Sequence, residues 1–344
     1  MSQPIAENAF GRATRLLDKI VGIEVEVARH QIIEAYEDYL AAIIQRYYEW
    51  YSAYENFKTA ESSYKENIKL FENIKERRKN NIALPIDVNK VQVQVYAKEE
   101  KLITLRSAYI QRLNMIKEAI RYDGRQKLLP ELPFLYKDLE MTFSQDYRRF
   151  KDESRTYRVL MMLEDKSSLE VARSADSLFP SIDLFAGISL EGSGYDIKSD
   201  EKKAVGGVSF ELPLPGQVER AEHQTAKIGH DKTTLSNQST YARLYTDLKN
   251  LYENIEREKK LIKIADEKIS LSMAILEDET ENYSYGKVSL NDLIDEINKL
   301  DENKFSKTIH MIQLRKLIVE WLRLTDRLIT RDKINELTPS QTAP

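Results

Sequence analysis

The chain has 344 residues, of which 31% are charged, and its formal net charge is -4. A balance so close to neutral offers no basic patch for nucleic acid, and a sequence without cysteine excludes disulfides, thiolate catalysis and thiolate metal sites. Only 11 residues are Gly and 9 are Pro, so the composition favours long helices.

The first part of the chain predicts two long helices joined by a short turn. From about Glu7 to Arg78 no Pro interrupts the sequence, and apolar residues follow the three- and four-residue steps of a heptad seam. About 70 helical residues extend on the order of 100 Å at about 1.5 Å per residue. Asn81 and Pro85 end this helix and begin the next, which carries a matching seam to Ile120, as in an antiparallel helical hairpin. The seam of the first helix includes Tyr36, Leu40, Ile43, Tyr47, Trp50, Tyr54 and Phe57.

The middle of the chain contains the only convincing β sequence. Asp123–Tyr147 loses the heptad and is predicted to be irregular with short helices, and Asp152–Ser177 is predicted to be a helix. Two arms of alternating apolar and polar residues follow between Phe179 and Ala221, separated by the polar loop GSGYDIKSDEKK. Each arm has about ten residues, the length that a tilted strand needs to cross a bilayer. Alternation alone also fits a hairpin on the side of a soluble helical domain.

After the β-hairpin the first half of the chain begins again. A helix is predicted from about Gln217 to Asn282, the turn YSYGKVSLND follows, and a second apolar seam runs back to Leu328. EAYEDYL aligns with RLYTDLK, pairing Tyr36 with Tyr245, and NIALPIDV aligns with GKVSLNDL. The offset in numbering is 209 at the first pair and 205 at the turn, which predicts about four extra residues, near one helical turn, in one half. The sequence therefore indicates a tandem duplication, with a disordered tail after residue 332.

Four segments carry a likeness to a known family: LPLPGQVERAEH, its degenerate copy QPIAENAFGRATR, SRTYRVLMMLEDKSSLEVARSADSLFPSIDL and YSYGKVSLNDLIDEI. With these segments, an amphipathic strand that leads into so long a helix, in duplicate, resembles the outer-membrane efflux proteins, the TolC-like exit ducts. The fold that it implies is mainly α, a long antiparallel coiled-coil helical barrel joined to a transmembrane β-barrel segment. The expected segments are a first repeat at 1–122, an irregular insertion and helix at 123–178, the outer-membrane hairpin at 179–214, a second repeat at 215–331 and the tail at 332–344.

The resemblance implies a homotrimer in the outer membrane, with the helices in the periplasm. It also implies a periplasmic adaptor and an inner-membrane transporter as partners, so that the duct itself is passive and serves efflux or type I secretion. A barrel strand meets lipid on one face and water on the other, which accounts for the alternation. Asp183, Ser189, Ser209 and Glu211 are assigned to the lumen. The lipid face is assigned to Ile182, Leu184, Ile188, Leu190, Val208, Phe210, Leu212 and Leu214.

The start of the chain departs from the family pattern. Family members open with a signal peptide, a helix pair and a first β-hairpin, whereas this sequence begins at the end of the strand before the long helix. MSQPIAENAFGRATR has no basic region followed by an apolar core, and no apolar run is as long as a membrane helix. The expectation is a truncated start, with two strands per protomer instead of four.

The tips of the helical hairpins are the expected functional site. The family pattern places two gate carboxylates at Asp292 and Asp295, which threefold symmetry would gather into a ring that attracts cations. Acidic residues in a first helical turn also serve as caps and offset the helix dipole, so this alternative stays open. Tyr283 and Asp87 match residues that link neighbouring helices in the closed state, while Val288 replaces the basic residue of that link.

Catalysis finds no support in the sequence. His30, His223, His230 and His310 are scattered over the helices without a metal-binding spacing, and no phosphate loop, dinucleotide fingerprint or GxSxG motif occurs. We therefore expect no enzyme and no cofactor. A structural coiled-coil protein or a truncated, non-conducting fragment remains an alternative. A periplasmic adaptor fits less well, since adaptors surround one helical hairpin with compact β domains.

Overall fold

The computed structural model describes residues 1–124, 128–132, 142–190, 202–212 and 216–329, with only the backbone at 189–190 and 202–203. These residues form two compact units, each drawn from both halves of the sequence. Unit 1 comprises Met1–Ala35 and Tyr147–Thr246, and unit 2 comprises Tyr36–Asp146 and Asp247–Pro344. The predicted tail, residue 191 and residues 192–201 of the predicted strand loop lie outside the described residues, whereas Lys202 and Lys203, predicted to be in that loop, begin a strand.

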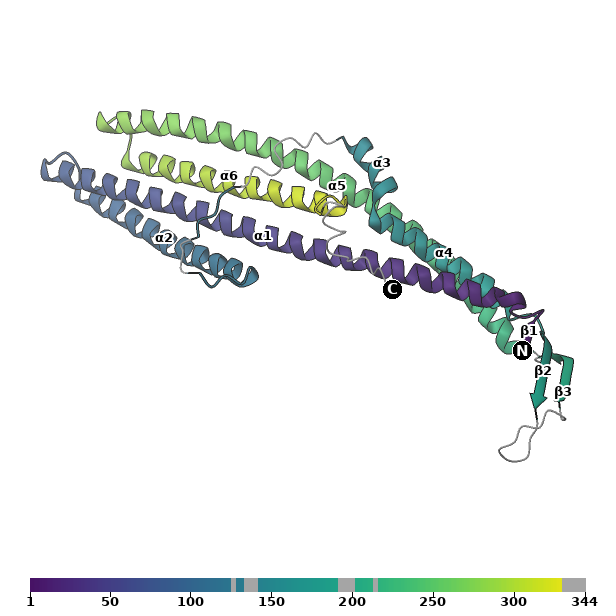
Figure 1. Ribbon diagram of the computed structural model, residues 1–344. Coiled ribbons are helices and arrows are strands. Elements are labelled where there is room, and N and C mark those ends of the chain that lie inside the picture. The colour runs from purple at the N-terminus through teal and green to yellow at the C-terminus, as the bar shows by residue number, and fades with distance from the viewer. Residues whose placement is uncertain (125–127, 133–141, 191–201, 213–215, 330–344) are drawn as a thin grey trace. The chain divides into compact units, whose positions relative to one another are not determined.

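Helices dominate both units (Figure 1). The two predicted helical hairpins and the predicted helix before the strands are all present, and a helix also occupies the end of the segment predicted to be irregular. No helix among the described residues is both long and apolar enough to cross a membrane. The helices are α1 (Arg12–Lys79), α2 (Pro85–Ala119), α3 (Phe143–Glu153), α4 (Arg155–Asp176), α5 (Gln217–Ser284) and α6 (Leu290–Leu324).

The helical hairpins repeat at one constant offset in residue number. α1 and α5 each have 68 residues, and α2 and α6 each have 35. The numbering rises by 205 from Arg12 to Gln217 at the helix starts, and again by 205 from Lys79 to Ser284 at the helix ends. Positions with positive φ repeat at the same offset, because Gly11, Asn81 and Arg121 have the counterparts Gly216, Gly286 and Asp326.

The predicted insertion in one of the two halves is therefore wrong. Tyr36 and Tyr245, which suggested it, lie at different distances from the starts of two helices of equal length. A single shared residue type is weak evidence for correspondence, whereas helix ends and positive-φ positions are fixed by the backbone path. The counterpart of any residue in the helical hairpins is thus found by adding 205 to its number, or by subtracting 205 from it.

Unit 1 contains an antiparallel sheet of three strands in the order β1 (Ser2–Pro4), β2 (Ser181–Leu190) and β3 (Lys202–Glu211). β2 and β3 pair over their whole length, from Ser181 opposite Glu211 to Leu190 opposite Lys202. β1 adds a third strand by pairing Gln3 with Leu184. The described residues thus form an open sheet, and three strands are too few to close a barrel, so the closed barrel stays a prediction.

Unit 1 also contains the beginnings of α1 and α5, which pack on either side of α4. Asn8 N donates a 2.7 Å hydrogen bond to Asp176 Oδ2 at the end of α4, where the carboxylate is buried. On the α5 side, Asn237 Nδ2 donates to Leu160 O over 2.8 Å, and the rings of Tyr157 and Tyr241 stack with centroids 4.3 Å apart. Polar and aromatic contacts thus hold α4 against its neighbours.

Unit 2 consists mainly of the two helical hairpins, whose helices lie in the order α2, α1, α6, α5 (Figure 1). Trp50 of α1 packs with Tyr109 and Ile116 of α2. The opposite side of α1 packs Ala41 and Tyr48 against Ile312 and Val319 of α6. Asn303 of α6 donates a 2.8 Å hydrogen bond to Ser272 Oγ of α5. Each inner helix therefore has a neighbour on two sides.

The heptad seam predicted for α1 covers only one of these sides. Trp50, Tyr54 and Phe57 face α2 as a seam predicts, but Tyr36 is exposed. Tyr48 is 1% exposed and belongs to the second side, which sequence periodicity missed. A helix that packs against two neighbours carries two stripes of buried side chains. A search of the sequence for a single heptad stripe finds only the more aromatic of the two.

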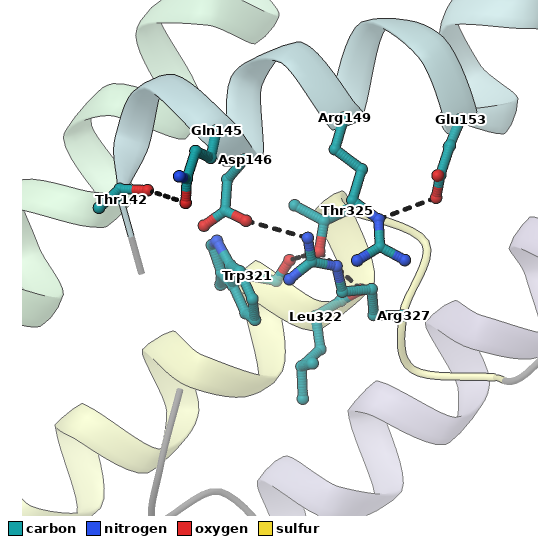
Figure 2. A network of polar contacts seen from close by, with 9 residues as sticks. All are labelled: Thr142, Gln145, Asp146, Arg149, Glu153, Trp321, Leu322, Thr325 and Arg327. Atoms are coloured by element: carbon teal, nitrogen blue, oxygen red, sulfur yellow. Dashed lines mark hydrogen bonds and ion pairs between the residues drawn. The ribbon is translucent and has the colours of Figure 1, made fainter. Parts of the chain in front are cut away.

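Within unit 2, polar contacts join the start of α3 to the residues at the end of α6 (Figure 2). Arg327 Nη2 lies 2.9 Å from Asp146 Oδ1, and its guanidinium lies 4.6 Å from the ring centroid of Trp321. Thr325 Oγ1 donates to Trp321 O over 2.7 Å at the last turn of α6. A buried Trp beneath an ion pair anchors this end of the helix.

Candidate functional site

The turn between α1 and α2 forms the first helical tip. α1 ends as Ile82 N donates to Arg77 O over 2.9 Å, with Asn81 in the left-handed region at φ 59°. Leu84 is the N-cap residue of α2, and its N–H donates to Asp87 Oδ2 over 3.1 Å. The structure thus places Asp87 in the first turn of α2, where it satisfies a backbone N–H that helix formation leaves free.

The second tip, between α5 and α6, has the same sequence of a left-handed residue, an N-cap and an acidic third helical residue, but its N-cap side chain also forms a hydrogen bond. Gly286 takes the left-handed position at φ 73°, and Ser289 is the N-cap of α6. Asp292 Oδ2 accepts hydrogen bonds from Ser289 N at 3.0 Å and from Ser289 Oγ at 2.8 Å. These hydrogen bonds to the ionised form hold the pKa of Asp292 below its ordinary value of 3.8.

Both predicted gate carboxylates are exposed at this tip. Asp292 and Asp295 lie in the first two turns of α6, where Leu293 between them is buried. The capping function of Asp292 is therefore observed. The ring of carboxylates stays a prediction, because it depends on neighbouring copies of the chain.

Tyr283 and Asp87 lie near each other at the tips, and the predicted link between them stays a prediction. Tyr283 packs on a cluster of buried apolar side chains, and the guanidinium of Arg77 lies 5.1 Å from its ring centroid. Burial raises the pKa of Tyr283, Arg77 lowers it, and the nearby charge of Asp87 raises it further. Among the described residues no hydrogen bond joins Tyr283 to Asp87, whose carboxylate caps α2 instead. Members of the cluster are Ile74, Ala83, Val91 and Leu290.

Sequence reasoning missed Arg77 as the basic residue of this tip. It belongs to the basic last turn of α1, and its Nε is buried against the neighbouring helices. Cations at a helix C-terminus are favourable because of the helix dipole, so the basic run was a usable signal. Val288, which replaces the basic residue of the family pattern, is half-buried in the turn before α6. A basic group is thus present at the tip, but it comes from α1.

The two faces of the β-hairpin have different chemistry. In the observed register Ile182 lies opposite Phe210 and Leu184 opposite Val208, so these four side chains share a face, with Ile188 further along it. All but the half-buried Ile182 are exposed, as is Leu212 beyond the strand. The side chains of Ser189 and Leu190 and all of Leu214 lie outside the described residues.

The opposite face carries Asp183, Ser209 and Glu211, as expected for a lumen, but it is not wholly polar. Phe185 also lies there, and its ring covers Gly207, where an added Cβ would come within 2.8 Å of it. A glycine at this position makes room for the aromatic ring. The assignment of the two faces to lipid and water stays a prediction.

Three of the histidines make structural contacts, and the described residues hold no cluster that could bind a metal ion. Ser167 Oγ lies 2.8 Å from His230 Nδ1, and Ser174 Oγ lies 3.0 Å from His223 Nδ1. His310 Nδ1 lies 2.8 Å from the buried Glu258 Oε2. Each of these pairs joins two helices, so the imidazoles help to hold the bundle together.

The sequence matches no family model, and no curated protein is similar to it in sequence. Solved structures give clear matches. The outer-membrane channel OprN is 17% identical, with a TM-score of 0.81 over 94% of this chain and 73% of that chain. The CmeC outer-membrane channel of Campylobacter jejuni is 14% identical, with a TM-score of 0.76 over 97% of this chain and 72% of that chain. The MtrE outer-membrane channel of Neisseria gonorrhoeae, solved in its open state, is 14% identical, with a TM-score of 0.75 over 96% of this chain and 75% of that chain.

The match to OprN covers 94% of this chain, so it takes in most of a chain built from two repeated helical hairpins with a strand before each long helix. The resemblance inferred from sequence motifs is confirmed by structure. The chain therefore has the fold of the TolC-like outer-membrane efflux channels.

Proposed function

We propose that this chain is the protomer of a passive exit duct in the bacterial outer membrane, serving a tripartite efflux or type I secretion system. The observation that carries the proposal is the match to an outer-membrane channel at a TM-score of 0.81 over 94% of the chain. Its two duplicated helical hairpins supply a periplasmic tunnel wall, and copies of the chain assemble as a homotrimer. The helices stand in the periplasm.

The two-faced β-hairpin supports the membrane part of this proposal. Ile188, Val208 and Phe210 are exposed on one face, and a row of large exposed apolar side chains suits contact with lipid. A sheet in a bilayer must have no unpaired edge, so β1 and β3 must each meet a further strand. Strands from other copies, or from other parts of the native protein, close the barrel.

The helical tips form the gate of the duct. Asp292 and Asp295 gather around the threefold axis and attract cations, since charged rings set the selectivity of pores. The Arg77 and Tyr283 contact, with Asp87 nearby, holds α1 and α5 together in the closed state. A periplasmic adaptor and an inner-membrane transporter engage the tips and move these helices apart. The transporter supplies the energy.

Fractionation of the source cell, followed by planar bilayer recording of the purified native protein, tests the proposal. We expect recovery from the outer membrane and cation-selective conductance. Asp292→Ala with Asp295→Ala should move the cation to anion permeability ratio toward one. Asp231→Ala with Glu267→Ala, exposed acidic residues on α5, is the matched control and should leave the ratio unchanged. Recovery from the soluble fraction without conductance would instead favour a structural coiled-coil protein.

A further inference from the structure

A buried layer of polar side chains joins α1, α2 and α6 within unit 2. Asp301 of α6 is 5% exposed, and Ser63 of α1 is 3% exposed. Asp301 Oδ2 lies 2.6 Å from Lys98 Nζ of α2 and also accepts a hydrogen bond from Ser63 Oγ. α1 lies between α2 and α6 (Figure 1), and the short Ser63 side chain leaves room for Lys98 to reach Asp301. A single carboxylate oxygen thus ties α6 to both helices of the first hairpin.

Amide side chains extend the layer toward the tips. Gln94 Nε2 of α2 donates a 2.7 Å hydrogen bond to Asn298 Oδ1 of α6. Asn67 of α1 is 0% exposed, and its Nδ2 donates to Ser63 O over 2.8 Å. The Oδ1 atom of Asn67 accepts no hydrogen bond from any residue that the structure describes. Buried polar groups, and an unmatched one above all, lower the stability of a protein interior.

On the tip side of this layer the same helices make apolar contacts. Val91 of α2 is buried in a cluster, and Ile294 of α6 packs against that cluster. Lys98 follows Val91 by seven residues, and Asp301 follows Ile294 by seven residues. The ion pair therefore occupies, one heptad further along, the positions that apolar side chains hold nearer the tips.

Apolar heptad rows can pack in more than one register. A shift of the hairpin of α5 and α6 by seven residues, about 10 Å at about 1.5 Å per residue, would bring one row against the other again. The short turns at the tips do not prevent such a shift, because each turn joins two helices of the same hairpin. Apolar packing alone distinguishes such registers weakly, since cores of similar pattern and volume tolerate rearrangement.

A shifted register would separate the ion pair. If α6 moved by seven residues toward the tips, Asp301 would meet Val91 of α2 and Leu70 of α1. Movement by the same amount in the opposite direction would bring Ile294 against Lys98. In both cases a buried charge would lose its partner, which strongly destabilises a protein interior.

The duplication does not repeat this layer. At the constant offset of 205, the residues that correspond to its three members cannot form an ion pair with each other, because none of them is acidic. The layer therefore marks the junction of α6 with the first hairpin and has no copy elsewhere in the helical hairpins. The counterparts of Lys98, Asp301 and Ser63 are Asn303, Tyr96 and Lys268.

We propose that Lys98, Asp301 and Ser63 fix the register in which the two helical hairpins of one chain pack together. A buried ion pair adds little stability compared with well-packed apolar residues, but it excludes every arrangement that leaves one of its charges alone. Single polar residues in apolar coiled-coil seams set the register in the same way. This role belongs to a single chain and does not depend on the proposed duct.

Apolar replacement of the layer separates its effect on register from its effect on stability. Lys98→Leu with Asp301→Leu and Ser63→Ala should unfold at the same temperature as the unaltered chain or higher, because no charge is then buried. Asp301→Leu alone should unfold at a lower temperature, since it leaves Lys98 without its partner. Lys98→Asp with Asp301→Lys keeps both charges and is the matched control.

Disulfide cross-linking reads the register, because the sequence has no cysteine. Gln94→Cys with Asn298→Cys reports the observed register, in which these two side chains are hydrogen-bonded. Lys101, whose ammonium lies 5.7 Å from the ring centroid of Phe305, marks the same register one heptad further along. Lys101→Cys with Asn298→Cys, and Gln94→Cys with Phe305→Cys, therefore report shifts of seven residues in the two directions. Each pair is placed in the full unaltered, apolar and charge-exchanged chains, and the linked peptides are identified by mass spectrometry.

In the unaltered and charge-exchanged chains, only the pair that reports the observed register should link. In the apolar variant, at least one shifted pair should link at least about tenfold more than in the unaltered chain. An apolar variant that is as stable as the unaltered chain and links only in the observed register would overturn the proposal. An apolar variant that unfolds as early as Asp301→Leu would also overturn it, because the layer would then supply stability and not register.

Discussion

The turn between α1 and α2 and the turn between α5 and α6 follow the same backbone path with different side chains. Asn81 and Gly286 share the left-handed position, at φ 59° and φ 73°. Leu84 offers no side-chain cap to α2, whereas Ser289 caps α6 with its hydroxyl. The duplication has preserved the turn geometry and the acidic third residue of each helix, while the strength of the cap has diverged.

The largest expected difference between the tips concerns burial. Leu290 is 5% exposed, whereas its counterpart Pro85 is exposed. Leu290→Ala should cost about 2–5 kcal/mol of local stability, because it leaves a cavity in a packed cluster. Pro85→Ala should change stability by less than about 1 kcal/mol. Hydrogen exchange of the amides at both tips measures each cost, and equal effects would contradict the difference in packing.

Backbone strain gives the next largest effect. No atom lies within 4 Å of a Cβ added to Gly286, so Gly286→Ala has only the positive φ to overcome, about 1–2 kcal/mol. Gly229, inside α5, also has open space around it and an ordinary φ. Gly229→Ala should therefore stabilise the helix by about 0.5–1 kcal/mol. Thermal unfolding of the two variants should shift in opposite directions, and a shared direction would rule out strain at Gly286.

Removing the N-cap side chain of α6 and adding one to α2 tests the difference between the two tips further. Ser289→Ala removes the hydroxyl acceptor at the start of α6 and should cost about 1 kcal/mol. Leu84→Ser adds a cap at the start of α2 and should gain a similar amount at most. Amide exchange in the first turn of each helix reads out both changes. A loss at α6 without a gain at α2 would mean that the backbone at Leu84 does not accept the same cap.

Lowering the pH should give the smallest change in the stability of the tips, because Asp292 is exposed. Its pKa in the folded protein is depressed below 3.8 by the hydrogen bonds from Ser289. The stabilising contribution of the carboxylate is therefore present above pH 3.8 and is lost as the pH falls through the lowered value. The first turn of α6 should fray in that range. Asp292→Asn should remove this pH dependence, as measured by amide exchange between about pH 5 and about pH 2.

Local sequence signals predicted the elements well because each depends on neighbouring residues. Pro85 and Asn81 marked the first tip, and the strict alternation from Ile182 to Leu190 marked β2. The third strand, β1, was recognised only as the end of a strand. The proposed gate residues Asp292 and Asp295 came from a motif match, and what the structure adds for Asp292 is its capping partner, Ser289.

Contacts between distant segments were beyond the reach of periodicity. The second packed side of α1, at Ala41 and Tyr48, depends on α6, which belongs to the other half of the duplication. The pairing of Arg77 with Tyr283 likewise joins the ends of two helices that the sequence treats separately. Such contacts leave no local pattern, because the two partners are brought together only when the chain folds.

The sequence by itself determined the helix lengths, the turns and the strand alternation, because these follow from backbone preferences and short-range spacing. Only the tertiary structure decided which face of each helix meets which neighbour. That choice depends on the simultaneous packing of α1, α2, α5 and α6, where one helix offers apolar residues to two partners and a single heptad pattern describes only one.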